Sequence, residues 1–293
     1  MWGEYAAGRR QHRLVRNEKD AWCLCESGGR VFGGLRDGSL LEWDASTLEE
    51  RQRLRCEGRV GGVFFMKEVG DLVISGHNDD HLRVWSTATG VCNRVLQGHT
   101  DAVWCVASGG QYLISGSGDK TVKVWANEGG SWPCLGTIDV HSGRVWAVVV
   151  WQGRVISGSE DTTIVVSDIV TQRHEATLEA HTGAVRALAV CDRTLLSTGD
   201  DSAIGVWALG TWNHLRMVRV SEHVPDALSC WCLAVSDSML LCGGRCKDRT
   251  SGFVVVLDTE STTCRHILRL DHYVGSLLSV RSEVCGMSEA GRA

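Results

Sequence analysis

The sequence predicts an all-β fold in which seven four-stranded antiparallel sheets stand around a common axis. Three observations lead to this prediction. A β-hairpin motif ending in tryptophan recurs along the chain, each copy carries an aspartate at a fixed distance before its end, and glycine is abundant while proline is scarce (34 and 2 residues). Glycine-rich turns without proline suit many short strands joined by tight bends. We expect residues 1–293 to form one domain of this kind.

The hairpin motif is clearest at residues 112–125, which read YLISGSGDKTVKVW. An apolar strand breaks at a Ser-Gly-Ser-Gly-Asp turn, and a second, alternating strand ends at a tryptophan. Similar hairpins end at Trp43, Trp85, Trp125, Ser167 and Trp207, which follow one another at intervals of 40 or 42 residues. The aspartates six residues before these positions are Asp37, Asp79, Asp119, Asp161 and Asp201. The hairpin is therefore the repeating unit of the chain.

A second motif precedes most hairpins and begins with a histidine. It reads GHTDAVWCV at 98–106, VHSGRVWAV at 140–148 and AHTGAVRAL at 180–188. A period of about 40 to 45 residues with four strands per repeat is typical of a β-propeller. On these motifs the sequence resembles the WD-repeat β-propeller family over nearly its whole length. Its short inner turns, as in VVVWQGRVISG, resemble those of F-box/WD, TRAF-type ligase and myosin-heavy-chain-kinase propellers.

The resemblance implies a buried hydrogen-bonded network within each complete repeat, made by the histidine, a serine of the second strand, the turn aspartate and the tryptophan. Two repeats carry all four residues: His99, Ser115, Asp119 and Trp125, and then His181, Ser197, Asp201 and Trp207. The repeat between them has Ser167 in place of tryptophan, and the first two repeats lack the histidine. Buried polar groups are stable when all of them are bonded. We therefore expect these residues to be structural.

Two weaker repeats complete the predicted ring. Residues 227–258 fit with Leu257 at the tryptophan position, and residues 275–293 begin a repeat that stops before its third strand. Trp2 aligns with the end of a third strand, and residues 12–15 then supply an outermost strand. The sequence thus predicts seven blades, with the last blade shared by both chain ends.

The candidate binding residues come from one position of the repeat, directly after the first valine of each inner strand. In the propeller family this position faces the top mouth of the central channel. It is occupied by Trp22, Phe64, Trp104, Trp146, Arg186, Trp231 and, we expect, Leu278. Tryptophan and arginine are the types most enriched at binding hot spots. One interpretation is a peptide-binding funnel, and the other is a set of rings that plug the channel.

Charged residues are predicted beside these rings. Arg36 and Arg144 join Arg186 as groups that can hold a carboxylate or phosphate. In the F-box-type propellers that this sequence resembles, phosphopeptide-binding arginines fall at the positions of Arg36 and Arg186. Glu160 and Asp200 oppose this, and with tryptophan walls they favour a Lys or Arg side chain instead. The sequence leaves the choice between the two ligand classes open.

The sequence carries no pattern of an enzyme. There is no nucleophile elbow or phosphate loop, and the paired acids at 78–80 and 199–201 lie in predicted turns. No catalytic residue, cofactor or metal is therefore expected. The 13 cysteines are interpreted as reduced core residues of a cytoplasmic protein, with nuclear location also open. A zinc site at Cys242 and Cys246 is the alternative.

The expected function is a non-catalytic scaffold that binds a peptide or loop of another protein at its top face, as a monomer within a larger assembly. The net charge of −5 argues against nucleic acid or an anionic membrane as a partner, and no apolar stretch is long enough to span a bilayer. The alternative is the substrate-recognition propeller of a ubiquitin ligase or kinase complex whose catalytic part lies on another domain or chain.

Overall fold

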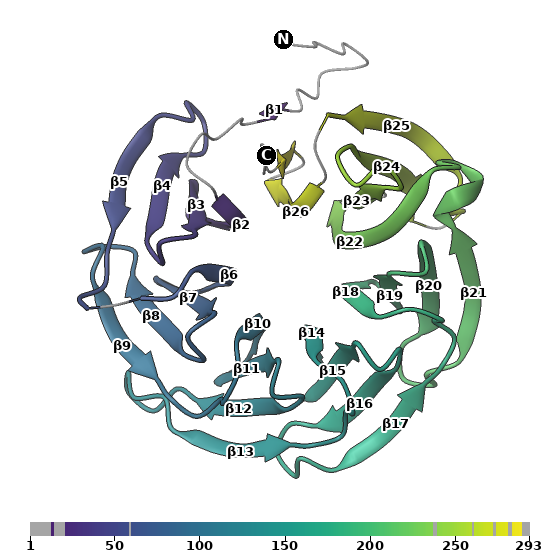
Figure 1. Ribbon diagram of the computed structural model, residues 1–293. Coiled ribbons are helices and arrows are strands. Elements are labelled where there is room, and N and C mark those ends of the chain that lie inside the picture. Colours follow the sequence, from purple (N-terminus) through teal and green to yellow (C-terminus); the bar gives the residue numbers. More distant parts are fainter. Residues whose placement is uncertain are drawn as a thin grey trace.

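A computed structural model describes residues 13–14, 21–58, 60–236, 239–259, 261–271, 274–280 and 283–288. Six four-stranded antiparallel sheets follow one another around a central axis in the order of the sequence (Figure 1). We number these blades 1 to 6. Within each blade the chain runs outward from the axis, so each strand pairs with the next one along the sequence.

The bounds of the strands follow the predicted repeat. The inner strands are β2 (Ala21–Ser27), β6 (Val63–Val69), β10 (Val103–Gly109), β14 (Val145–Trp151), β18 (Val185–Cys191) and β22 (Ala227–Ser236). The second strands are β3 (Arg30–Leu35), β7 (Leu72–His77), β11 (Tyr112–Ser117), β15 (Arg154–Ser159), β19 (Thr194–Gly199) and β23 (Met239–Cys246). The third strands are β4 (Leu40–Asp44), β8 (Leu82–Ser86), β12 (Val122–Ala126), β16 (Ile164–Asp168), β20 (Ala203–Ala208) and β24 (Gly252–Asp258). The outer strands are β5 (Glu50–Leu54), β9 (Cys92–Leu96), β13 (Cys134–Ile138), β17 (His174–Leu178), β21 (His214–Arg219) and β25 (Cys264–Leu270).

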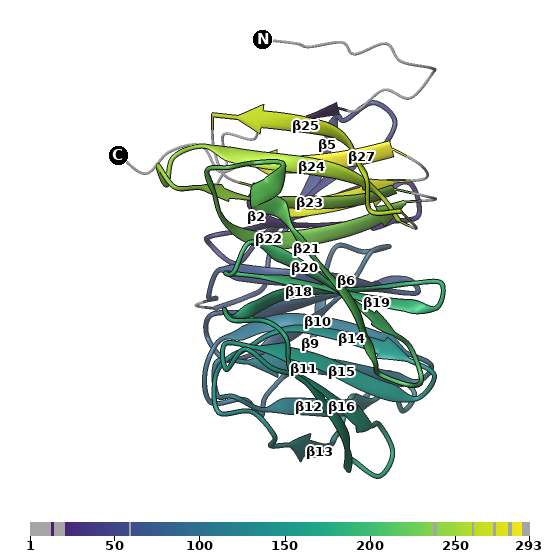
Figure 2. The same ribbon diagram turned by 90° about the vertical axis from the view of Figure 1, so that its right-hand side faces the viewer.

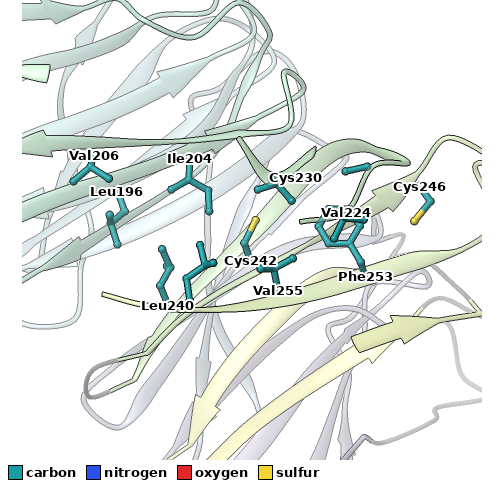
Figure 3. Close-up of a cluster of buried hydrophobic side chains, with 13 residues drawn as sticks. Leu196, Ile204, Val206, Val224, Cys230, Leu240, Cys242, Cys246, Phe253 and Val255 are labelled. Atoms are coloured by element: carbon teal, nitrogen blue, oxygen red, sulfur yellow. The ribbon is translucent and has the colours of Figure 1, made fainter. Parts of the chain in front are cut away.

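The cores lie between neighbouring blades, because one sheet alone cannot bury both of its faces. Seen from the side, successive sheets stack face to face (Figure 2). The cluster between blades 5 and 6 joins Leu196 and Ile204 of blade 5 to Leu240 and Phe253 of blade 6 (Figure 3). The short 3-10 helix η1 (Val220–Glu222), which links these two blades, adds its buried Val220 to the same core.

The prediction of seven four-stranded blades is wrong, since the described residues form six. The ring is closed by a three-stranded sheet of β26 (Val274–Val280), β27 (Glu283–Ser288) and β1 (Arg13–Leu14). The strand β26 contacts both β22 and β2. The N-terminal strand β1 pairs directly with β27 and runs parallel to it, so it is neither the fourth strand nor an antiparallel one. The predicted role of Trp2 lies outside the described residues.

The face of the ring on which the inner strands begin is called the top face below. The turns between the second and third strands lie on this face too. The backbone N–H groups of Asn78, Gly118, Glu160 and Asp200 in these turns donate to the carbonyl oxygens of Gly62, Ala102, Arg144 and Ala184, which directly precede the inner strands. The candidate residues from the two parts of the repeat are thereby brought together.

Candidate binding site at the top face of the ring

Each inner strand contains a β-bulge at the position singled out from the sequence. The register of the ladder shifts between the two residues that flank this position, for example between Val103 and Cys105 in blade 3. The bulged residues of the six blades are Trp22, Phe64, Trp104, Trp146, Arg186 and Trp231. A bulge leaves one residue out of the ladder and redirects its side chain. Because the bulge recurs in every blade, these six side chains depart in the same way from the in–out alternation of side chains along their strands.

Four of these side chains form a continuous aromatic arc across blades 1 to 4. The rings of Trp22 and Phe64 are stacked with their centroids 5.2 Å apart, and those of Phe64 and Trp104 with theirs 4.0 Å apart. Trp104 and Trp146 follow at 4.6 Å with a tilt of 57°. Offset stacked and tilted contacts of this kind are favourable between aromatic rings. We call these four residues the aromatic arc.

Arg186 of blade 5 ends the aromatic arc and is held in place by two neighbours. Its guanidinium carbon lies 4.2 Å from the centroid of the Trp146 ring, in a cation–π contact. Its Nε and Nη2 donate to the Asp200 carboxylate at distances of 2.7–3.1 Å. Since Asp200 already neutralises this cation, Arg186 is poorly suited to bind a phosphate of a ligand.

The other arginines of the site differ in how firmly they are paired. Arg144 lies 3.9 Å from the Glu160 carboxylate, and both side chains are half-exposed, so this pair is weak. Arg36 is exposed, and no ion pair joins it to another residue in the described ranges. Arg245, which the sequence did not single out, stacks on Trp231 at 4.6 Å. Arg36, Arg144 and Arg245 are therefore less fully neutralised than Arg186 and are the cations more available to an anionic ligand.

Leu278 was assigned wrongly to the channel position of the closing sheet. The register of this sheet shifts between Val274 and Ser276, so the bulged residue is Gly275. Leu278 pairs regularly with Cys285 further along the strand. The ladder register decides which residue is extruded, and a glycine at this place carries no ring that a sequence pattern would reveal.

The aromatic arc combines features of the two interpretations, a plug and a binding surface. Its rings pack on one another, and the indole nitrogens of Trp104 and Trp146 are buried without a hydrogen-bond partner among the described residues. All four side chains nevertheless remain partly exposed to solvent. The four rings are therefore packed against one another and still present aromatic surface to solvent.

The network residues of blade 3 lie within hydrogen-bonding distance of one another. His99 donates from Nδ1 to Asp119 (2.7 Å) and accepts at Nε2 from the Ser115 hydroxyl (2.7 Å), which accepts from Trp125 Nε1 (2.9 Å). His181, Ser197, Asp201 and Trp207 repeat this arrangement in blade 5. Burial alone would raise the pKa of Asp119, but the hydrogen bonds from His99 and Thr121 hold it far below its usual value. These side chains are occupied within the blade and are not available to a substrate.

Blade 2 has a histidine in its network that the sequence analysis missed. His77 comes from the end of the second strand rather than from the segment before the inner strand. It accepts from Ser75 at Nε2 (2.6 Å) and donates from Nδ1 to the Gly61 carbonyl (2.7 Å), while Trp85 donates to Ser75. The turn residue Asp79 does not bind this histidine and instead forms a bidentate ion pair with Arg83. The sequence could have revealed this histidine, because His77 occupies the strand position that Ser117 and Ser159 hold in the next two blades.

In blades 1 and 4 the network is incomplete. Blade 1 has Gly33 in place of the serine, and a Cβ there would lie 2.6 Å from the Trp43 ring, so this ring packs directly on the backbone. In blade 4, His141 joins Asp161 and Ser157 at 2.9 and 2.8 Å. The hydroxyl of Ser167, at the tryptophan position, is buried without a partner among the described residues.

The described residues contain no group of three His, Cys, Asp or Glu side chains that could hold a metal ion. Cys242 and Cys246 are buried and free, and both lie on β23. Burial raises the pKa of Cys23, Cys105 and Cys232 far above that of an ordinary thiol. Within the part of the chain that the structure describes, no helix is long and apolar enough to cross a membrane.

Comparison with known proteins supports the repeat assignment. The family model "WD domain, G-beta repeat" matches residues 90–126, 132–168 and 172–208. The chain is 31% identical over 85 residues to Cell division control protein 4 of Saccharomyces cerevisiae, an alignment of 29% of this chain and 11% of that protein. It is 38% identical over 50 residues to WD repeat-containing protein pop1 of Schizosaccharomyces pombe, which covers 17% of this chain and 6% of pop1. The matches thus span a small part of each relative. Together with the ring of four-stranded blades, they show that the chain contains WD repeats and folds as a β-propeller.

Proposed function

We propose that this propeller is a non-catalytic scaffold that binds a peptide or loop of a partner protein over the aromatic arc at its top face. The observation that carries the proposal is the bulge in every inner strand of the six blades, which presents Trp22, Phe64, Trp104, Trp146 and Arg186 side by side. Partly exposed aromatic rings at the rim of a rigid ring are suited to anchor an apolar side chain.

The charges around the arc favour a ligand that is not bound through Arg186. The charge of Arg186 is neutralised by Asp200, and its guanidinium lies over the Trp146 ring. Arg36 and the weakly paired Arg144 are exposed cations, while Glu160 is an exposed acid. A segment with an apolar anchor and flanking polar residues matches this surface.

The experiment is selection of peptides from a displayed random library on the purified protein, followed by binding measurements on variants. Trp104→Ala and Trp146→Ala each remove an anchor ring and should weaken a selected peptide by about 2 kcal/mol or more. Val170→Ser is the matched control, because Val170 is 70% exposed in the turn after β16, away from the arc. Variants are compared only when their circular dichroism and melting curves match the parent. If both folded tryptophan variants bind like the control, the arc is a structural plug and the proposal is wrong.

A narrower candidate is the substrate-recognition part of a ubiquitin ligase or kinase complex. It rests on the resemblance of the inner turns to those of F-box/WD propellers, and the repeats similar to Cell division control protein 4 are compatible with it. The test is whether a partner that binds through Trp104 becomes ubiquitylated or phosphorylated in cells that express the parent chain. The modification should fall in cells that express Trp104→Ala. An unchanged modification would remove this candidate and leave the scaffold.

A further inference from the structure

Two cysteines from neighbouring blades meet at the seam between blades 1 and 2. Cys56 lies in the connector that leads from β5 of blade 1 to β6 of blade 2, and Cys92 is the first residue of β9, the outer strand of blade 2. Both are half-buried, and both pack against one cluster that contains Phe32 of blade 1 and Trp85 of blade 2.

The place of Cys56 follows from comparison with the next connector. Leu54 and Leu96 are buried residues at the ends of β5 and β9, and each pairs with the first residue of the preceding strand. Two residues later the connectors carry Cys56 and Gly98, respectively. These two positions are therefore structurally equivalent.

A Cβ at Gly98 would lie 3.1 Å from the Trp125 ring and 3.6 Å from the Lys123 side chain. The counterparts of these residues in blade 2 are Trp85 and Arg83. The connector thus brings Cys56 to the side of β8 that carries Trp85 and Arg83. The ladder between β8 and β9 sets Cys92 opposite Trp85 on this same side.

The side-chain contacts agree with this placement. The nearby Cys56 raises the pKa of both Cys92 and Arg83, as expected when its thiol lies beside these two side chains. Burial, and then the neighbouring Cys56, raise the pKa of Cys92 to about 12. Cys92 is consequently protonated near neutral pH, and Arg83 provides a positive charge on the same side of β8.

We propose that Cys56 and Cys92 form a peroxide-sensitive dithiol that closes to a disulfide across the seam of blades 1 and 2. The Cys56 thiolate attacks one oxygen of hydrogen peroxide, the O–O bond breaks, and a sulfenic acid and hydroxide form. The Cys92 sulfur then attacks the Cys56 sulfur, the S–O bond breaks, and the oxygen leaves as water with the proton of Cys92. In sum, two thiols and one hydrogen peroxide give one disulfide and two waters.

The disulfide would tie the connector of blade 1 to the outer strand of blade 2. This connector continues to Gly61, whose N–H donates to Asp79 and whose carbonyl accepts from His77. The inner strand with Phe64 of the aromatic arc begins directly after it. Oxidation would therefore restrain the backbone that leads into the top face.

The test treats the folded protein with a small excess of hydrogen peroxide and maps thiols and cross-linked peptides by mass spectrometry. We expect a peptide that links Cys56 to Cys92, which dithiothreitol cleaves and which Cys56→Ser and Cys92→Ser both lack. Cys134→Ser is the matched control, because Cys134 has the position of Cys92 in blade 3 but faces Gly98 rather than a cysteine. The control should form the Cys56–Cys92 link as the parent does.

The proposal is overturned if peroxide produces no Cys56–Cys92 link at any dose that leaves the protein folded, or if Cys56 is oxidised equally fast to sulfinic acid with and without Cys92. A variant that introduces a second cysteine pair tests the proposal independently. Gly98→Cys places a thiol opposite Cys134 in blade 3, so it should form a second peroxide-dependent link between these two residues. Failure of the folded variant to do so would contradict the equivalence of the two connectors on which the proposal rests.

Discussion

At the scale of single residues, the structure separates polar groups that hold the blades together from those that do not. Ser115 accepts from Trp125 and donates to His99, so its hydroxyl links two buried side chains. Ser167 stands at a tryptophan position in blade 4 and is buried with its hydroxyl unbonded among the described residues. The cost of a buried polar group depends on whether it is paired. Two serines of similar burial should therefore respond in opposite ways to the same change.

We expect Ser115→Ala to lower the free energy of unfolding by roughly 2 kcal/mol or more, because two buried groups lose their partner. Ser167→Ala should leave it unchanged or raise it by up to about 1 kcal/mol, since an unpaired hydroxyl is removed. Chemical denaturation measures both changes, with the dependence of the free energy of unfolding on denaturant concentration held the same for parent and variants. A loss at Ser167 as large as that at Ser115 would contradict the assigned bonding.

At the scale of the element, the repeat pattern predicted the strands but not every set of residues that forms the buried hydrogen-bond network of a blade. The spacing of the tryptophans and aspartates fixes where each hairpin lies, because side-chain alternation and turn residues are local properties. In blade 2 the same buried serine is satisfied by His77 from another strand position. Such a replacement depends on which side chains meet in space. The sequence pattern therefore identified a missing histidine without finding its substitute.

The neutral state of His77 predicts a pH dependence of stability. Burial and then the nearby Arg83 lower the pKa of His77 to about 4, against an ordinary value of 6.5. Below pH 6.5 the unfolded chain binds a proton that the folded chain does not, so stability falls as the pH decreases toward 4. The shift corresponds to at most about 3 kcal/mol over this window. His141, whose pKa is also lowered by burial, adds to the same slope.

We therefore expect the free energy of unfolding of the parent to decline between pH 6.5 and pH 4. The decline should be shallower in His77→Gln, which cannot take up a proton. Denaturation at half-unit pH steps measures both slopes. Equal slopes in the two proteins would mean that His77 is not kept neutral by its surroundings.

At the scale of the whole molecule, the ring arrangement brings the bulged residues of successive inner strands together on one surface. Each inner strand of the six blades has its bulge near the top face, so residues about 40 positions apart in sequence become neighbours. The candidate residues were found from the sequence because the repeat aligns equivalent positions. Their stacking order, the capture of Arg186 by Asp200 and the extrusion of Gly275 rather than Leu278 depend on register and packing between blades. The number of strands in the closing sheet and the direction of β1 were also mispredicted, because neither leaves a periodic pattern in the sequence.

The central claim is that the aromatic arc, rather than the outer strands, receives the partner. Hydrogen–deuterium exchange with and without a selected peptide tests it most directly. The account predicts that bound peptide slows exchange at residues 102–106 and 144–148, where the inner strands of blades 3 and 4 begin. Outer strands β9 and β13 should be unaffected. Slowed exchange confined to residues 92–96 and 134–138, with no change at the inner strands, would contradict the account.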